Sequence, residues 1–262
     1  MTRLRQIQTL IQMLLEELPQ YRREAAAFPR NEAAQRRLLR GLMNLRPPLP
    51  LRPDYLALQD ALLSAEREAR GVVDVQTLPA AADPRIVLWQ GDITRLNADA
   101  IVDADNSSLL GCFVPCHGCI DNAIHSAAGS QLREECRALM AAQGHPEEAG
   151  GAKITGGYNL PCRYVLHTVG PIIRGEVTES DRLALASCYR ACLELAAARD
   201  LHSVAFCCIS TGEFRFPNQD AAEITVAAVK EFLRRDTRNR RVIFNVFKDR
   251  DLQIYRGLLG SA

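Results

Sequence analysis

The densest group of chemically active side chains in the sequence lies between residues 112 and 119. This segment, CFVPCHGC, contains Cys112, Cys116, His117 and Cys119. Thiolate sulfur and imidazole nitrogen are ligands that zinc prefers, in tetrahedral geometry. Three ligands would leave one position open for water or substrate, as in catalytic sites, whereas a fourth from Cys116 would close a structural site. The spacing is not that of a standard zinc knuckle, so free thiols in a loop are the alternative.

A carboxylate follows this cluster directly. Asp121 lies two residues after Cys119, at the start of the apolar segment IDNAIH, and His125 follows four residues later. Residues four apart lie on one face of a helix, so Asp121 and His125 could face the same side. The stretch therefore indicates a metal site beside an acidic group. We expect His167, inside a β-rich run, to be a hydrogen-bonded core residue.

Polar and small residues also follow each predicted strand. In open α/β sheets, ligands bind beyond the carboxyl ends of the strands, so these segments predict one shared cleft. The segments are GDIT (91–94), DADNSSLLGC (103–112), GGYNLP (156–161), TVGP (168–171) and STGEFRFP (210–217).

Two of these segments have both a functional and a structural interpretation. Asp92 in GDIT could accept a hydrogen bond from an exocyclic amine, or it could cap the following turn. The loop STGEFRFP could cradle a phosphate with its backbone N–H groups, and Phe214 and Phe216 could flank a ring. The alternative is an ordinary turn whose aromatic side chains pack on the core.

The elements that must position these residues fall into two regions. Residues 1–80 have helical periodicity, with a plausible N-cap at Asn31 and a helix starting near Asp54. From about residue 85, short runs such as RIVLWQGD and SVAFCCIS alternate with amphipathic helical patterns, which predicts an α/β layer sandwich. We therefore predict a helical N-terminal extension over 1–80 and an α/β domain over 81–262.

The composition excludes several classes of protein. Hydrophobic residues make up 47% and charged residues 24% of the 262 residues, as in soluble globular proteins. A formal net charge of +1 provides no strong field for nucleic acid or acidic membranes. Neither a signal peptide nor a transmembrane run is recognisable. The nine cysteines are odd in number and several lie in apolar segments, which favours reduced thiols in a cytoplasmic protein.

Taken together and in order, the motifs resemble the macrodomain family of ADP-ribose binders and hydrolases. They are GDIT, DAIVDADNSSLLG, IDNAIHSAAG, AKITGGYNLPCRYVLHTVGPI and CISTGEFRFP, within about residues 85–260. The resemblance implies a three-layer α/β/α sandwich with a mixed central sheet. The insertion CFVPCHGC, where most macrodomains have glycines, and the helical extension are similar to the zinc-containing microbial branch. That branch is implied to remove mono-ADP-ribose from proteins, often alongside a sirtuin-type transferase and lipoylated carrier proteins.

The resemblance also implies a role for individual residues. Zn²⁺ would be held by Cys112, His117 and Cys119, with Cys116 an extra thiol. Asp121 and Asn106 would be catalytic, next to the distal ribose. The residues implied to bind ADP-ribose are Asp92 and Ile93 at adenine, Asn106 at the distal ribose, and Ser210, Thr211, Gly212, Glu213 and Phe214 around the diphosphate and distal ribose.

One departure from the family pattern concerns the segment NAAN. Asp103 stands where the family has its first Asn, and Asp105 stands where it has a small residue. Two additional carboxylates near a diphosphate would weaken its binding unless they face away or bind water.

These observations lead to two hypotheses of function. The first is a zinc-dependent hydrolase that cleaves the ester between an acidic side chain and the anomeric carbon of ADP-ribose. In it, zinc polarises a ribose hydroxyl or a water, and Asp121 orients the water or acts as base. The second is a reader that binds ADP-ribose without cleaving it, with a structural zinc closed by Cys116. Replacing Cys116 by Ser should abolish metal binding only in the second case.

Overall fold

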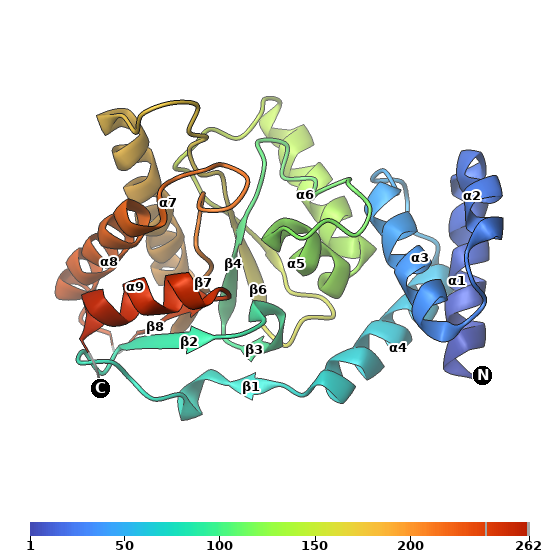
Figure 1. Ribbon diagram of the computed structural model, residues 1–262, viewed down its shortest axis with the longest axis horizontal. Coiled ribbons are helices and arrows are strands. Elements are labelled where there is room, and N and C mark those ends of the chain that lie inside the picture. Colours follow the sequence, from blue (N-terminus) through green and yellow to red (C-terminus); the bar gives the residue numbers. More distant parts are fainter. Residues whose placement is uncertain (239, 261–262) are drawn as a thin grey trace.

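The computed structural model describes residues 1–238 and 240–260, and the N-terminal part of the chain is helical (Figure 1). The Asn31 side chain accepts a hydrogen bond from the N–H of Ala34, which confirms the predicted N-cap. This part has its own apolar core, which includes Ile7, Leu10 and Leu39. Its helices are α1 (Arg3–Glu17), α2 (Arg22–Ala27), α3 (Glu32–Leu45) and α4 (Pro53–Arg70), with a 3₁₀ turn η1 at Pro19–Tyr21.

A six-stranded sheet forms the centre of the second part. Its strands follow the order β2-β8-β7-β4-β6-β5, and every neighbouring pair is parallel except β5 with β6. The predicted mixed sheet is therefore confirmed. The strands are β2 (Ile86–Gln90), β4 (Ala100–Ala104), β5 (Lys153–Gly156), β6 (Tyr164–Thr168), β7 (Ser203–Phe206) and β8 (Arg241–Val246).

Helices cover both faces of this sheet, which gives the predicted three-layer sandwich (Figure 1). Helices α5 and α6 lie on one side, whereas α7 and α8 lie on the other, and α9 packs on β2 and β8. The buried strands are apolar because both of their faces are covered. The helices are α5 (Ile120–Ala128), α6 (Ser130–Gln143), α7 (Glu179–Ala198), α8 (Asn218–Arg235) and α9 (Asp249–Leu259).

A short segment joins the two parts. Strand β1 (Val73–Asp74) pairs in parallel with β3 (Leu96–Asn97). Two 3₁₀ turns, η2 (Val75–Thr77) and η3 (Ile93–Arg95), flank this pairing in the sequence. None of the helices in the described part of the chain is long and apolar enough to span a membrane.

The antiparallel direction of β5 corrects one prediction. We expected residues 156–161 to join the shared cleft because they follow a strand. They follow the one strand that runs in the opposite direction, so they lie at the other edge of the sheet. There the Asn159 side chain donates to Asp60 of α4 at 2.8 Å, so this segment contacts the helical extension.

Candidate functional site

The predicted metal ligands lie together beyond the carboxyl end of β4. The chain leaves β4 and crosses this edge of the sheet before α5 begins (Figure 1). Single ligand atoms of Cys112, His117 and Cys119 lie within 4.8 Å of one another, and all three residues are partly exposed. Cys112 Sγ is 3.7 Å from His117 Nδ1. Two thiols and one imidazole are a donor set that fits zinc and leaves a fourth position open.

Cys116 points away from these three residues. Its φ is +53°, and its backbone N–H donates to Asn44 Oδ1 of α3 at 2.9 Å. Its thiol donates to the carbonyl of Arg37 at 3.4 Å. Helix α3 therefore holds Cys116, and the thiol does not complete the cluster of three ligands.

Cys119 is also the N-cap of α5. Its sulfur accepts the N–H of Asn122 at 3.4 Å, which explains why the helix starts at this residue. Burial raises the pKa of the Cys119 thiol to about 12. The thiol therefore needs a bound cation to become a thiolate near neutral pH, as metal binding provides.

Asp121 connects the loop 112–119, which carries the predicted metal ligands and is called the metal loop below, to the predicted ribose contact. Its Oδ1 accepts the N–H of Cys112 at 3.1 Å, and its Oδ2 accepts the side-chain N–H of Asn106 at 3.4 Å. Burial, together with the charge of Asp105, raises the pKa of Asp121 well above its usual range. The structure thus brings the two predicted catalytic residues together beside the metal ligands.

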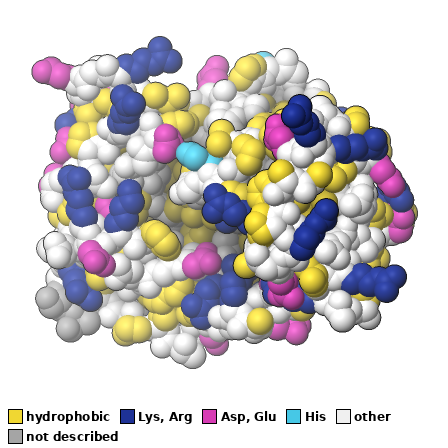
Figure 2. Space-filling view, turned by 45° about the vertical axis from the view of Figure 1, so that its right-hand side comes forward, with side chains coloured by type: hydrophobic (Ala, Val, Ile, Leu, Met, Phe, Trp, Pro, Cys, Tyr) yellow, Lys and Arg dark blue, Asp and Glu magenta, His cyan; other side chains and the backbone are white. Residues whose placement is uncertain are grey.

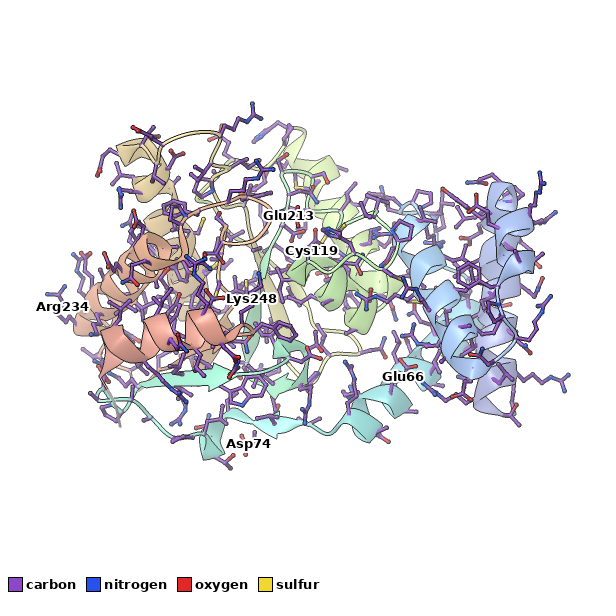
Figure 3. All side chains as sticks on the ribbon, viewed as in Figure 1. Glu66, Asp74, Cys119, Glu213, Arg234 and Lys248 are labelled. Carbon is purple, nitrogen blue, oxygen red and sulfur yellow. The ribbon has the colours of Figure 1, made fainter. Side chains whose placement is uncertain are left out.

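The loop after β7 lies beside the metal loop. Figure 3 shows Glu213 near Cys119, and Glu213 Oε1 is 3.8 Å from His117 Nε2. Ser210 has a φ of +63°, and no residue within 1–238 and 240–260 hydrogen-bonds its buried hydroxyl. Thr211, Gly212 and the Phe214 ring are partly or fully exposed in the same loop. The predicted ADP-ribose residues of this segment therefore form one turn at the carboxyl end of the sheet.

Phe216 does not line the cleft, contrary to one interpretation of the sequence. Its side chain is 1% exposed and belongs to the apolar core, and its N–H donates to the Ser210 carbonyl at 2.9 Å. The ring is in the core because the turn reverses the chain before α8. Phe214 alone remains as an aromatic side chain of this loop that could contact a ring.

Asp92 caps the following turn, as one of its two interpretations predicts. Its Oδ1 caps η3 by accepting the N–H of Thr94 at 3.0 Å. Its Oδ2 lies 3.4 Å from Arg70 of α4 and is partly exposed, so it remains available to an adenine amine. The Ile93 side chain is buried, so only its backbone can contact a ligand.

Sequence reasoning missed two residues at this end of the cleft. Phe247 follows β8 directly and is 75% exposed, and its carbonyl accepts a hydrogen bond from Gln90 at the end of β2. A large aromatic residue just after an apolar strand was the available signal. No signal in the sequence indicated Arg70, because it reaches Asp92 from the helical extension, a distant part of the sequence.

A groove of about 790 Å³ separates the helical extension from α5 and Asp92. Figure 2 shows Lys and Arg side chains around a hollow on this face. Its lining is rich in arginine: Arg3, Arg36, Arg37, Arg40 and Arg70.

The Asp103 and Asp105 side chains face away from the predicted ADP-ribose cleft at the carboxyl end of the sheet. Both are buried at the β4 end, where Asp105 Oδ2 lies 2.6 Å from Nδ1 of the core residue His167. Their carboxyl groups are therefore directed into the core rather than at a bound diphosphate.

Comparisons with known proteins place these features in context. The profile of the Macro domain family matches residues 102–225. A protein-ADP-ribose hydrolase of Treponema medium is 47% identical, with 95% of this chain and 96% of that protein covered. A Fusarium oxysporum protein named a probable bifunctional ADP-ribose hydrolase/ADP-ribosyltransferase is 42% identical over 86% of this chain and 41% of its own. The Trypanosoma brucei macrodomain in complex with ADP-ribose has a TM-score of 0.66 at 31% identity, over 84% of this chain and 95% of that one.

Proposed function

This chain belongs to the macrodomain family and is a hydrolase of protein-bound ADP-ribose, and we propose that it removes mono-ADP-ribose from acidic side chains with the help of zinc. Zinc would be held by Cys112, His117 and Cys119, and the protein would then belong to the zinc-containing branch of the family. One observation carries the proposal. The carboxylate of Asp121 is fixed to the backbone of Cys112 at 3.1 Å, so an acid–base group lies directly beside an open three-ligand metal site.

The cleft would bind the ADP-ribose group along the carboxyl edge of the sheet. Asp92 Oδ2 would accept the adenine amine, with the exposed Phe247 ring nearby. The turn 210–214 would receive the diphosphate through its backbone, and Asn106 would hold the distal ribose. Binding energy from these remote contacts would position the ester over Asp121.

Asp121 would accept the proton of the attacking water. Hydrolysis adds one water and releases ADP-ribose and the free carboxylate of the protein. A carboxylate whose pKa is raised by burial is a stronger base than an ordinary aspartate, which suits this role. Zinc, when bound, would supply Lewis-acid polarisation of a ribose hydroxyl or a water.

The first test is release of ADP-ribose from a protein mono-ADP-ribosylated on Asp or Glu. We expect Asp121→Ala to reduce turnover by at least about 100-fold, the usual contribution of a general base. We expect Cys119→Ser to lose both zinc, measured by metal analysis, and activity. Full turnover by the Asp121 variant would refute its role, and binding of ADP-ribose without any release would indicate a reader.

Cys116→Ser is the matched control for the metal site. Because the Cys116 thiol bonds to the Arg37 carbonyl and not to the three ligands, the variant should retain one zinc at this site and its activity. Loss of this zinc would show instead a closed, structural site.

We further propose a partner and a location. The Fusarium relative carries a transferase name beside its hydrolase name, which supports a functional link with an ADP-ribosyltransferase. The resemblance of the sequence motifs to the zinc-containing branch adds the proposal that the substrate is a lipoylated carrier protein modified by a sirtuin-type transferase in the cytoplasm. Incubation of the carrier with the transferase and then with this hydrolase tests the substrate by mass spectrometry.

A further inference from the structure

A second cluster of possible metal ligands is buried beneath the cleft. Asp103 ends the apolar part of β4 and pairs in register with His167 of β6. Asp105 follows β4, and His125 enters from α5. One ligand atom from each of these four residues lies within 4.8 Å of the others. The four side chains are 5% exposed or less, and none belongs to the Cys112, His117 and Cys119 group.

Several polar atoms in this cluster have no hydrogen-bond partner among the residues that the structure describes. They are both carboxylate oxygens of Asp103, Oδ1 of Asp105, and both ring nitrogens of His125. Each buried polar atom without a partner costs on the order of 1 to 3 kcal/mol. So many such atoms around one point indicate a group that satisfies them together.

The spacing in the cluster favours a metal ion as that group. His125 Nε2 lies 3.9 Å from Asp103 Oδ2, which is too long for a hydrogen bond. Two ligand atoms bound to one ion at ~2.1 Å in tetrahedral geometry are about 3.4 Å apart. A small movement of either side chain would therefore bring both into one coordination sphere.

We propose that Asp103, Asp105, His125 and His167 hold a second divalent metal ion with a structural role beneath the ADP-ribose cleft. Two carboxylates balance the two charges of the ion, so the buried site is neutral. Two oxygen and two nitrogen donors suit Zn²⁺, Fe²⁺ or Mn²⁺. Four protein ligands close the site, which is typical of structural rather than catalytic metals.

The ion would displace protons from two of its ligands, because burial raises the pKa of Asp103 well above its usual range and, against the effect of burial, the hydrogen bond with Asp105 raises the pKa of His167. Burial lowers the pKa of His125 to about 3, so its imidazole is neutral and ready to bind a metal. Asp105 Oδ2 bonds His167 at 2.6 Å, but Asp105 Oδ1 remains free. His167 would lose one proton and turn from Asp105 towards the ion. Three further groups border the cluster. The Thr155 hydroxyl hydrogen-bonds His167 Nε2 at 2.8 Å, Asp121 Oδ1 lies 3.6 Å from His125 Nε2, and Cys136 Sγ lies 3.8 Å from His167 Nε2.

Metal analysis of the full-length protein tests this proposal. After loading with Zn²⁺ and removal of the excess, we expect two ions per chain. The variant C112S/C119S should keep one ion, and D103N/D105N should also keep one, because neutral amides cannot balance the charge. Asp251→Asn, a buried aspartate of α9 far from the cluster in the sequence, should keep two and serves as the control.

Cobalt provides a second readout. In C112S/C119S, bound Co²⁺ should show visible absorption without a sulfur-to-metal band. No ion in C112S/C119S, or the same ion count in folded D103N/D105N as in the unaltered protein, would each overturn the proposal. If D103N/D105N does not fold, the ion count and the cobalt spectrum of C112S/C119S decide the question.

Discussion

His117 faces two different groups with its two ring nitrogens. Nδ1 lies 3.7 Å from Cys112 Sγ, whereas Nε2 lies 3.8 Å from Glu213 Oε1. A histidine that binds metal through one nitrogen commonly donates the other N–H to a carboxylate, which fixes the ring and strengthens the ligand. A small movement would let Glu213 accept the N–H of His117, which would couple the turn 210–214 to the loop that carries the predicted metal ligands.

We predict that Glu213→Gln weakens zinc binding by about tenfold, the low end of the usual effect for such carboxylates, because Glu213 is largely exposed. The amide keeps the shape of the side chain but loses its charge. Competition with a chelator of known affinity measures the change. Glu194→Gln, an exposed glutamate on α7, is the control and should bind zinc like the unaltered protein. Equal zinc affinities in the two variants would show that Glu213 does not strengthen His117 as a zinc ligand.

Among the elements, α3 supports the metal loop most directly. Arg40 donates to Asn122 Oδ1 of α5 at 2.7 Å, and Asn44 accepts the N–H of Cys116 at 2.9 Å. In return, the guanidinium of Arg133 on α6 donates to carbonyls at the end of α3 and to the carbonyl of Leu110. A cation at a helix C-terminus also interacts favourably with the helix dipole. The helical extension and the metal loop are therefore held by one set of contacts.

We predict that Arg133→Met lowers the free energy of unfolding by about 3 kcal/mol, because it leaves several buried carbonyls without a donor. Burial lowers the pKa of Arg133 to about 10, so its charge is still present at pH 7. Urea unfolding measures the change. Arg137→Met on the same helix removes an exposed ion pair with Glu134 and should cost less than about 1 kcal/mol. Similar losses in both variants would contradict the proposed role of burial.

At the scale of the whole molecule, the sequence predicted those features that depend on residues close together in the chain. The layered fold followed from the alternation of strands and helices, and the proximity of Cys112, His117 and Cys119 followed from their positions only a few residues apart. The direction of Cys116 did not, because Asn44 and Arg37 on α3 determine it from a distant part of the sequence. The buried cluster of Asp103 and His167 was hidden for the same reason, since only the β4–β6 register brings these residues together. The reversed strand β5 showed no signal in its composition.

The arginine-lined groove exists only because the two parts of the molecule pack together. The groove also reaches Cys116, next to the predicted metal ligands and the proposed distal-ribose site, so a modified protein whose ADP-ribose occupies the cleft would present its own surface to this end of the groove. Figure 3 shows Glu66, which lines the groove, on helix α4 of the helical extension, and Arg234 at the opposite end of the molecule. Arg3 and Arg36 pair with Glu66, and Arg70 pairs with Asp92. Arg37 and Arg40 form no ion pair within residues 1–238 and 240–260, and these two favour a protein substrate with an acidic surface.

We predict that Arg37→Glu raises KM for an acidic ADP-ribosylated protein by about fivefold, on the order of 1 kcal/mol for an exposed charge. The turnover number should not change, because Arg37 is exposed and lies outside the Asp121 site. The increase should diminish at 0.5 M salt, where the Debye length falls to about 4 Å. Arg234→Glu makes the same change of charge on α8 and should leave KM unaltered. Steady-state kinetics with both variants at two salt concentrations would separate recognition by the groove from a general effect of net charge, since a general effect would shift both variants equally.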